Sequence, residues 1–527
     1  MSSEPAHTIP QLLNDAAARF GDKAAIVEDG QHFSYQTLNE QRQQAAKAFI
    51  ASGVKAGERV AIWAPNVSEW IVITLGLQSV GAILVPLNVR WSGAEAADVL
   101  RRSGAVMLFS CGPLEKGQPL DLLANESLPD IQSRVMLRGS AAGADSYDAF
   151  LARGESVADE VLAQHEQQLS ADSIADMLFT SGTTGKPKGV LCSHEQNIRA
   201  FSTWSQTVGL RADDRYLIIN PFFHSFGYKA GWLAALISGC TIYPALSFDR
   251  EKVMQQISDD RITMLPGAPS LYEMILADPN RKQYDLSSLR LGVTGAAAVP
   301  VQLVRDMRDK LGFETVVTAY GLTESTGVVS ICRPEDDPET IASTSGRAID
   351  GVEVRCVDPG SLEVVAPGQE GEIWVRGYNV MKGYFDMPEA TAETITEDGW
   401  LRTGDIGIMD DAGYLKITDR LKDMYIMNGE NVYPAEIEKC LFAHPNVAQV
   451  AVIGVPKAPQ GEVGMAFVVL KDGAAFEADA LSAFCKERLA RYKVPMYFEA
   501  IDSLPMNASG KVLKPELRKR ASERAQS

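Results

Sequence analysis

Short apolar runs typical of buried β-strands alternate along the chain with segments whose apolar residues recur at helical spacing. The segment Tyr35–Ile50 is of the helical kind, and Ser34 stands in front of it as a cap. The runs of the strand kind are Val60–Ala64, Ala105–Ser110, Tyr216–Asn220 and Thr241–Pro244. This alternation predicts layers of helices packed on parallel sheets, an α/β fold.

One uncharged stretch, from Trp70 to Val89, is long enough to cross a membrane. Polar residues, two glycines and Pro86 interrupt it. A buried helix at about Trp70–Val80, followed by a buried strand at about Ala82–Pro86, accounts for this pattern better. We therefore predict no transmembrane segment.

From Ser345 the pattern changes to short strands separated by glycine and proline. Val352–Val357, Glu372–Arg376 and Tyr414–Ile417 predict a β-rich subdomain, and the charged segment Asp419–Asp423 suits a domain edge. We expect a large N-terminal domain of layered α/β sheets that includes this subdomain, residues 1–421. A small, mobile α+β C-terminal domain follows, residues 422–527.

The C-terminal domain has its own pattern of elements. A helix is expected to begin at Pro434, because proline is favoured at the first helical position. The strands Val447–Val455 and Met465–Leu470 follow, and then a helix at about Ala478–Tyr492.

Composition narrows the function classes. The chain has 527 residues with a formal net charge of −18, so nucleic acid is a poor partner. The seven cysteines contain no C-x-x-C pair and the N-terminus shows no signal-peptide pattern. We expect a cytoplasmic protein, and the sequence is compatible with a homodimer.

The strongest chemical signal is the segment Thr180–Gly189, which follows the strand-like Met177–Phe179. Its glycines let the backbone approach a ligand, its hydroxyl and amide groups donate hydrogen bonds, and its lysines neutralise anions. It is not a P-loop of the G-x-x-x-x-G-K-[ST] kind, because Pro187 follows Lys186. The segment predicts a phosphate-binding loop rather than a chance turn.

This loop resembles the signature of the adenylate-forming (ANL) superfamily, which includes acyl-CoA synthetases, firefly luciferase and nonribosomal-peptide adenylation domains. Further motifs resembling those of the superfamily follow in its order as far as Lys511, so the likeness covers nearly the whole chain. It implies an ATP-dependent acyl-CoA ligase of lipid, fatty-acid or steroid metabolism. It also implies that ATP is bound by Thr180, Ser181, Gly182, Thr183, Thr184, Gly185, Lys186 and Lys188, with Thr184 also catalytic.

The acyl pocket is implied by Pro221–Gly227, which resembles the superfamily's aromatic motif beside the reacting carboxyl group. By composition alone, a histidine among phenylalanines is more often a packed core residue. The likeness instead makes His224 catalytic and places it in the acyl pocket with Phe226, Ala230 and Gly295. Phe226 and Ala230 share one face if a helix begins here. Lys229 is expected to face water.

Two motifs resemble those that hold the adenine and the metal. Thr294–Ala298 is similar to the adenine-side strand and turn, which assigns Gly295, Ala296 and Ala297 to nucleotide binding. Ala319–Glu324 resembles the next motif. There the likeness places Tyr320 and Gly321 at the adenine, Thr323 at the α-phosphate, and Glu324 on Mg²⁺ as a catalytic residue and metal ligand.

The remaining motifs resemble those around the ribose, the hinge and the reactive lysine. Asp405, in Trp400–Asp405, is placed on the ribose hydroxyls, and Arg420 near the ribose and phosphate. Lys422 matches the hinge. The likeness assigns the approach of CoA to Asn428, Gly429 and Glu430, and adenylation and ATP binding to Lys511.

The chemistry of the first half-reaction explains why such residues are needed. A carboxylate must attack the α-phosphorus of ATP, so two anions have to meet, and the site must supply positive charge and alignment. Lys511 and Mg²⁺ would supply the charge. A rotation about Lys422 would then withdraw Lys511 and admit CoA.

The sequence leaves the acid and the acceptor open. The segments Asp213–Gly231, Cys332–Asp337 and Asp419–Tyr425 are similar to actinobacterial ligases for a bicyclic propanoate from steroid rings C and D, with departures at Ser225 and in the Asn428–Glu430 loop. A medium- or long-chain fatty acid is the alternative substrate. A separate carrier protein is the alternative acceptor. A luciferase-like oxidase and a non-catalytic nucleotide-binding module are less favoured.

Overall fold

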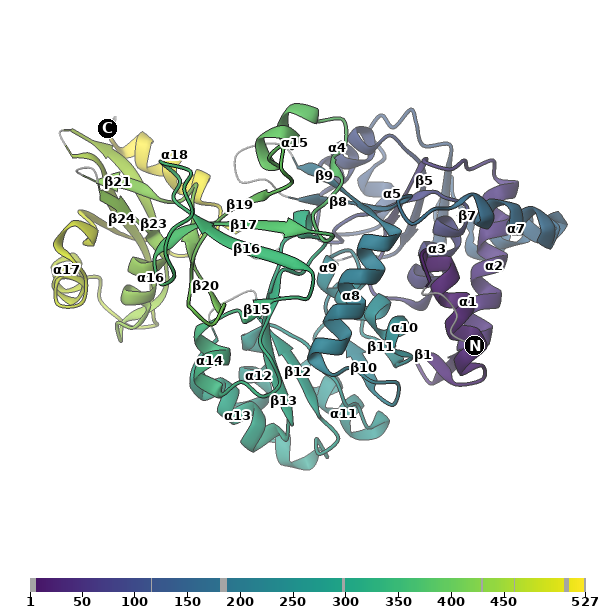
Figure 1. The fold of residues 1–527 in the computed structure, drawn as a ribbon, viewed down its shortest axis with the longest axis horizontal. Coiled ribbons are helices and arrows are strands. Elements are labelled where there is room, and N and C mark those ends of the chain that lie inside the picture. Colours follow the sequence, from purple (N-terminus) through teal and green to yellow (C-terminus); the bar gives the residue numbers. More distant parts are fainter. Residues whose placement is uncertain are drawn as a thin grey trace.

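The computed structural model describes residues 6–114, 116–180, 187–295, 299–427, 430–458, 460–506 and 511–525, with the backbone alone at 430–431 and 524–525. It has the expected α/β fold. Figure 1 shows the chain as an elongated molecule, with the part that follows residue 421 at one end and helices near the N-terminus at the other.

The largest sheet has eight strands. Strands β8, β4, β3, β5, β6 and β7 are parallel to one another. At one edge, β9 is antiparallel to β8, and β18 is antiparallel to β9. In sheet order the strands are β18 (Gly383–Tyr384), β9 (Lys188–Ser193), β8 (Ile174–Thr180), β4 (Ile83–Pro86), β3 (Arg59–Trp63), β5 (Ala105–Cys111), β6 (Ser133–Arg138) and β7 (Asp145–Ser146). Central strands β3 and β4 are almost wholly buried, as expected where helices cover both faces.

The helices of this first region confirm the predicted periodicity. Ser34 caps α2, with its Oγ accepting a hydrogen bond of 3.0 Å from the Thr37 N–H. The twelve-residue helix α3 is buried nearly all round, as predicted for the uncharged stretch. The helices are α1 (Ile9–Phe20), α2 (Tyr35–Ala51), α3 (Ser68–Ser79), α4 (Gly93–Ser103), α5 (Pro119–Leu122), α6 (Tyr147–Ala152), η1 (Arg153–Ser156), α7 (Asp159–Gln168) and α8 (His194–Val208).

A second layer is formed by two four-stranded sheets. They are joined by isolated bridges through Met264, which pairs with Tyr216 on one side and with Leu291 on the other. The first sheet runs β10 (Arg215–Ile218), β11 (Thr241–Pro244), β1 (Ala24–Glu28) and β2 (Gln31–Ser34). The second runs β12 (Leu291–Thr294), β13 (Thr315–Tyr320), β14 (Ser330–Ile331) and β15 (Arg347–Ala348).

Most of the helices of this layer are short. They are α9 (Ser225–Gly227), the π-helix η2 (Tyr228–Leu233), α10 (Ala234–Ser238), α11 (Arg250–Asp260), α12 (Pro269–Leu276), η3 (Arg281–Gln283), α13 (Val301–Leu311), η4 (Thr323–Ser325) and α14 (Pro338–Ser343). One continuous apolar core links this layer with the inner face of the eight-stranded sheet. The active-site segments described below therefore stand on a single packed body.

The β-rich subdomain is an antiparallel sheet. Its strands are β16 (Val352–Val357), β17 (Glu370–Gly377), β19 (Leu401–Met409) and β20 (Leu415–Arg420), and α15 (Pro388–Thr394) precedes β19. Strand β20 continues through Arg420, so the charged segment begins inside a strand and only Leu421–Met424 separates it from the next strand.

The C-terminal part is a five-stranded sheet with helices on both faces. Its elements are β21 (Tyr425–Met427), β22 (Glu430–Val432), α16 (Pro434–Phe442), β23 (Val447–Lys457), β24 (Gly461–Leu470), α17 (Ala478–Lys486), η5 (Arg491–Lys493), β25 (Tyr497–Ala500) and α18 (Lys514–Ala525). Alternate residues of β23 enter two separate small cores. The helix expected to reach Tyr492 ends at Lys486, because a turn and the 3₁₀ helix η5 replace its last part.

None of the helices in the part of the chain that the structure describes combines the length and the apolar character needed to cross a bilayer.

Candidate active site

The predicted phosphate-binding loop connects β8 to β9. Thr180, at the end of β8, pairs with Lys188, at the start of β9, so these two residues mark the base of the hairpin. Arg102 holds the loop's exit by donating a hydrogen bond of 2.5 Å to the Pro187 carbonyl. The other predicted loop residues, Ser181, Gly182, Thr183, Thr184, Gly185 and Lys186, lie outside the described residues.

A tyrosine that the sequence analysis missed connects this hairpin to Glu324. Tyr384, in the edge strand β18, donates a hydrogen bond of 3.0 Å to Glu324 Oε1. The Lys188 ammonium lies 4.6 Å from the centroid of the same ring, within cation–π range. The Glu324 backbone carbonyl is also held, by the Met381 N–H at 2.9 Å. A Gly-Tyr pair in a β-rich stretch carries no signal that would have revealed this contact.

The turn that carries Glu324 needs a glycine at its start. A Cβ atom on Gly321 would lie 2.3 Å from the Gly327 carbonyl oxygen and 2.6 Å from Val328 Cα, so a larger residue would displace backbone. Tyr320 precedes this glycine at the end of β13, and Thr323 begins η4. The close backbone contact therefore fixes Tyr320, Thr323 and Glu324 relative to one another.

Asp405 lies at the centre of a second polar group. Its Oδ2 accepts a hydrogen bond of 2.7 Å from Tyr320 Oη, and its Oδ1 lies 3.2 Å from Arg420 Nε. Asp405 and Arg420 are cross-strand neighbours in β19 and β20. Burial and the Asp405 carboxylate raise the pKa of the Tyr320 phenol, so the hydroxyl stays protonated and donates. The structure thus brings together three predicted residues that are far apart in sequence.

The turn before Asp405 is held by Glu372, another residue that the sequence analysis did not select. Glu372 Oε1 accepts a hydrogen bond of 3.0 Å from the Gly404 N–H, and its Oε2 accepts one of 2.7 Å from Trp374 Nε1. Thr403 donates a hydrogen bond of 2.7 Å to the Ile373 carbonyl. A buried carboxylate with both oxygens engaged keeps this turn in one conformation.

Lys511 comes from the C-terminal part and reaches this site. Its pKa is lowered by burial and by Arg420, while Asp405 and Glu324 oppose the shift. Burial, and also the Lys511 ammonium, lower the pKa of His224 to about 4. These mutual effects require Lys511 to lie close to groups of the acyl, metal and ribose motifs. Among the described residues, Lys511 thus has electrostatic neighbours in all three motifs.

His224 follows β10 and caps the short helix α9. Its Nδ1 accepts a hydrogen bond of 3.4 Å from the Phe226 N–H. The imidazole is accessible to solvent, although protein atoms surround it closely enough to disfavour its charged form. The lowered pKa leaves His224 neutral at pH 7.

The helix expected to place Phe226 and Ala230 on one face is not a regular α-helix. The chain passes from α9 into the π-helix η2, and Gly231 has non-helical torsions of φ −87° and ψ −108°. The i to i+5 hydrogen bonds widen the turn here, and the shared face of Phe226 and Ala230 stays a prediction. Phe226 is half-buried and Ala230 is buried. Gly295 directly follows β12, whose last residue, Thr294, pairs with Thr318 of β13.

Lys229 does not face water, contrary to the prediction. Its side chain is fully buried, and Nζ lies 3.0 Å from Asp176 Oδ1 in an ion pair. Burial alone would lower the pKa of Lys229, but the Asp176 carboxylate raises it, so the ammonium stays protonated. A lysine is almost never fully buried unless it is paired, and the sequence does not show which acid will meet it.

The predicted hinge residue Lys422 lies two residues beyond the end of β20 and is exposed. Burial, with a contribution from Arg420, lowers its pKa to about 8. Asn428 and Gly429 lie outside the described residues, as do Ala296 and Ala297. The Glu430 backbone belongs to β22, opposite Met427.

The described residues fit a magnesium ion that arrives with ATP. They contain no group of three or more His, Cys, Asp or Glu side chains able to hold a metal ion by themselves. Glu324 offers one carboxylate near the predicted phosphate loop. One or two carboxylates together with substrate phosphates is the usual set of ligands for Mg²⁺.

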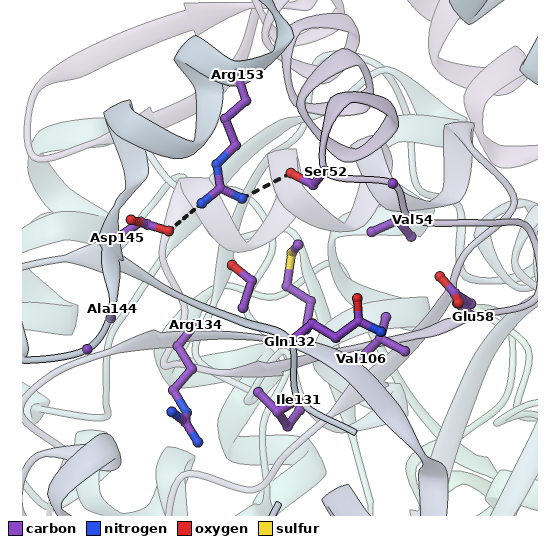
Figure 2. Close-up of a pocket in the computed structure, with 14 residues that line it drawn as sticks. Ser52, Val54, Glu58, Val106, Ile131, Gln132, Arg134, Ala144, Asp145 and Arg153 are labelled. Carbon is purple, nitrogen blue, oxygen red and sulfur yellow. Dashed lines mark hydrogen bonds and ion pairs between the residues drawn. The ribbon is translucent and has the colours of Figure 1, made fainter. Parts of the chain in front are cut away.

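A separate hollow of about 550 Å³ lies at the other edge of the eight-stranded sheet, beside β6 and β7. Figure 2 shows Arg153 reaching across it to Asp145 and Ser52, with a hydrogen bond of 3.1 Å to Ser52 Oγ. Glu58 and Arg134 also line it. It contains none of the predicted site residues, and Arg153 is already paired with Asp145.

Comparison with known proteins decides the family. The model described as AMP-binding enzyme matches residues 13–385, and that described as AMP-binding enzyme C-terminal domain matches residues 436–511. This chain belongs to the AMP-binding enzyme family. It is an ATP-dependent acid–thiol ligase: the family forms an acyl-adenylate from a carboxylic acid and transfers the acyl group to CoA.

Similar proteins support this membership along the whole chain. A 3-[(3aS,4S,7aS)-7a-methyl-1,5-dioxo-octahydro-1H-inden-4-yl]propanoyl:CoA ligase of Rhodococcus jostii (strain RHA1) is 46% identical over 98% of this chain and 99% of its own. The ligase of the same name from Mycobacterium tuberculosis (strain ATCC 25618 / H37Rv) is 45% identical, over 97% and 98%. The crystal structure of the anthranilate CoA ligase AuaEII in complex with anthranoyl-AMP superposes with a TM-score of 0.85 at 27% identity, covering 99% of this chain and 98% of that one.

Proposed function

We propose that the described site performs the adenylation half-reaction, with Lys511 as its central charge. A carboxylate oxygen of the acid attacks the α-phosphorus of ATP, the bond to the β-phosphate oxygen breaks, and pyrophosphate leaves. The observation that carries this assignment is the position of Lys511, whose ammonium interacts with His224, Glu324, Asp405 and Arg420. An ammonium at this point can bridge the two anionic reactants and lower their mutual repulsion.

The other residues would hold the nucleotide. In this proposal Asp405 accepts hydrogen bonds from the ribose hydroxyls while Arg420 faces the ribose and phosphate. Tyr320, Gly321, Gly295, Ala296 and Ala297 form the adenine side, Thr323 binds the α-phosphate, and the segment Thr180–Lys188 surrounds the triphosphate. The existing contact between Tyr320 and Asp405 supports this grouping, because it already joins the base and ribose motifs.

Glu324 would hold Mg²⁺ together with the phosphates of ATP. The ion would supply positive charge to the departing pyrophosphate. Tyr384 orients this carboxylate through its hydrogen bond, and the Lys188 ammonium lies 4.6 Å from the centroid of the same ring. These three side chains therefore form one supported unit for the triphosphate.

The second half-reaction requires Lys511 to leave, so that the CoA thiol can reach the acyl carbon. We assign the pivot to Lys422, between an N-terminal domain at 1–421 and a C-terminal domain at 422–527, with Asn428, Gly429 and Glu430 approaching CoA afterwards. Support comes from the separate small cores of the C-terminal part, which allow it to move as one body.

The acid is proposed to be the bicyclic propanoate that the two relatives act on. Identities of 46% and 45% over nearly complete chains support a shared substrate class. The proposed acyl pocket contains His224, Phe226, Ala230 and Gly295, and the small Ala230 and Gly295 leave room for a fused ring system. A neutral imidazole at His224 does not attract the carboxylate away from Lys511.

A panel of acids tests this assignment. Purified protein with MgATP and CoA is given 3-(7a-methyl-1,5-dioxo-octahydro-1H-inden-4-yl)propanoate, octanoate and palmitate, and AMP and acyl-CoA are quantified. We expect kcat/KM for the bicyclic acid to exceed that for either fatty acid by at least about tenfold, since losing pocket contacts costs 1–3 kcal/mol. Equal or higher values for a fatty acid would contradict the substrate. Acyl transfer only to an added carrier protein would contradict CoA as the acceptor.

The proposal includes a cytoplasmic location and compatibility with a homodimer. All seven cysteines are unpaired thiols, which supports a reducing compartment and the predicted cytoplasmic location. Light scattering of the purified protein tests the predicted compatibility with a homodimer.

A further inference from the structure

The buried ion pair between Lys229 and Asp176 has no role in the chemistry proposed above. Both side chains are 0% exposed, and Nζ lies 3.0 Å from Oδ1. Burying two charges costs several kcal/mol for each ion, and well-packed apolar residues in their place are often as stable. Stability alone is therefore a poor explanation for this pair, and the elements that it connects suggest another.

Asp176 lies in the strand that leads into the phosphate-binding hairpin. Its partner across the hairpin is Cys192 of β9, and its Oδ2 accepts a hydrogen bond of 2.6 Å from Asn197 Nδ2 in α8. Lys229 belongs to η2, the distorted helix that also carries Ala230 of the proposed acyl pocket. The ion pair thus ties the wall of one binding site directly to the base of the other.

A second contact runs beside the first. Gln78 of α3 donates hydrogen bonds to Tyr228 Oη, at 3.0 Å, and to the Ala175 carbonyl, at 3.2 Å. Tyr228 also stacks on Trp232, with ring centroids 4.8 Å apart. Two successive residues of η2 are therefore linked to two successive residues of β8: Lys229 directly to Asp176, and Tyr228 through Gln78 to Ala175. This fixes the register between η2 and β8.

The same cluster reaches the turn that carries Glu324. Cys192 Sγ lies 3.7 Å from Thr326 Oγ1, and Thr326 donates a hydrogen bond of 2.7 Å to the Asn379 carbonyl. Thr326 has a left-handed backbone, φ 59°, directly after η4. Displacement of the Lys229–Asp176 pair would be transmitted through these contacts to the hairpin, to η2 and to the Glu324 turn, because the cluster is close-packed.

We propose that Lys229 and Asp176 are positioning residues that couple the binding of the carboxylic acid to the binding of ATP. They set the acyl-pocket wall at a fixed distance from the phosphate-binding hairpin, so that each substrate stabilises the arrangement that the other requires. Neither residue touches the reacting atoms. The inference rests on the proposed function for the location of the acyl pocket.

The test is the effect of nucleotide on acid affinity in a double-mutant cycle. Lys229→Met, Asp176→Asn and the double variant are compared with the wild type, and calorimetry gives the Kd of the acid with and without α,β-methylene-ATP and Mg²⁺. The acid is whichever member of the panel the wild type turns over, so failure of the substrate assignment is detected separately. The ratio of the two Kd values measures the coupling.

We expect the acid to bind the wild type more tightly when the analogue is present. In the double variant, the ratio of the acid Kd without the analogue to the Kd with it should be smaller by about fivefold or more. Lys229→Arg, which keeps the charge, should restore most of the coupling relative to Lys229→Met. The single neutral variants should have the lowest Tm, because each leaves one buried charge unpaired. A double variant with the wild-type ratio and wild-type acid Kd would overturn the proposal, whatever its Tm. A wild-type ratio of one would also overturn it.

A matched control separates coupling from general destabilisation. Arg290 and Asp214 form another buried ion pair, near the start of β10, with side chains 10% and 1% exposed. Arg290→Met with Asp214→Asn should lower Tm without changing the coupling ratio. If the Lys229/Asp176 double variant does not fold, Gln78→Leu loosens the parallel contact without a charge change. It should reduce the ratio, and an unchanged ratio in that variant would equally overturn the proposal.

Discussion

The chain on either side of Lys422 is packed in two different ways. Before it, one continuous core runs from Ile9 to Leu415, and Tyr320, Glu324 and Asp405 stand on that core. After it, a single sheet carries a small core on each face and contributes Lys511. The comparison teaches that the groups proposed to hold ATP stand on an extensive core, whereas the ammonium proposed to react comes from a part with its own small cores, which suits the movement proposed for it.

Within the part before Lys422, the largest effect is expected at Asp405. Asp405→Asn weakens the contacts with Tyr320 and Arg420 and those proposed with the ribose. ATP KM should rise about tenfold to a hundredfold, because hydrogen bonds to charged groups are worth 1.5–3 kcal/mol. AMP release at varied ATP measures the change. Asp411→Asn, at an exposed neighbouring position, is the control and should be neutral. An ATP KM no higher than that of the control would remove Asp405 from the nucleotide site.

A smaller effect is expected at Tyr384. Tyr384→Phe removes the hydrogen bond to Glu324 but keeps the ring beneath Lys188, so kcat/KM for ATP should fall about twofold to tenfold. Steady-state kinetics at saturating acid and CoA measure it. Tyr414→Phe is the control. It removes a comparable hydrogen bond, of 2.5 Å, from Tyr414, in the turn between β19 and β20, to the Asp336 carboxylate. The account is weakened if the two variants have the same kcat/KM.

The smallest effect on activity, but a measurable one on stability, is expected where the two parts meet. Asp419 of β20 accepts a hydrogen bond of 2.8 Å from the Ala435 N–H at the start of α16, and burial raises its pKa to about 6. The pKa of Asp419 is higher in the folded state than in the unfolded state, so the protonated carboxyl group stabilises the fold. This contribution of Asp419 to the free energy of unfolding is complete below about pH 4 and is lost as pH rises through about 6.

Asp419→Asn removes this titration. Between about pH 7.5 and about pH 4, the free energy of unfolding of the wild type should gain up to about 3 kcal/mol relative to the variant. Thermal unfolding at stepped pH gives the comparison as a difference in Tm. Parallel Tm–pH curves for wild type and variant would show that Asp419 does not titrate in this range.

The sequence predicted the elements well where a local pattern determines them. Thr241–Pro244, Val352–Val357 and the helix start at Pro434 agree with the structure, because strand runs and a first-turn proline are local signals. It predicted the site through motifs spread from Thr180 to Lys511, and the structure brings several of those residues together. Local patterns could not show which side chains would pair across the fold.

The errors have the same physical origin. Lys229 was placed in water because the identity of its partner, Asp176, depends on tertiary packing. Tyr384 was overlooked because its contact with Glu324 exists only once β18 joins β9. The π-helix η2 was not foreseen because its sequence pattern looks the same as that of an α-helix.

The central claim is that Lys511 serves adenylation and must be absent from thioester formation. Single-turnover assays of Lys511→Ala, with Lys519→Ala as an exposed control in the same part of the chain, separate the two steps. Formation of acyl-adenylate from acid and ATP should slow by at least about a hundredfold, while transfer from supplied acyl-adenylate to CoA changes by less than about threefold. An equal loss in both half-reactions, or an unchanged rate of adenylation, would contradict the account.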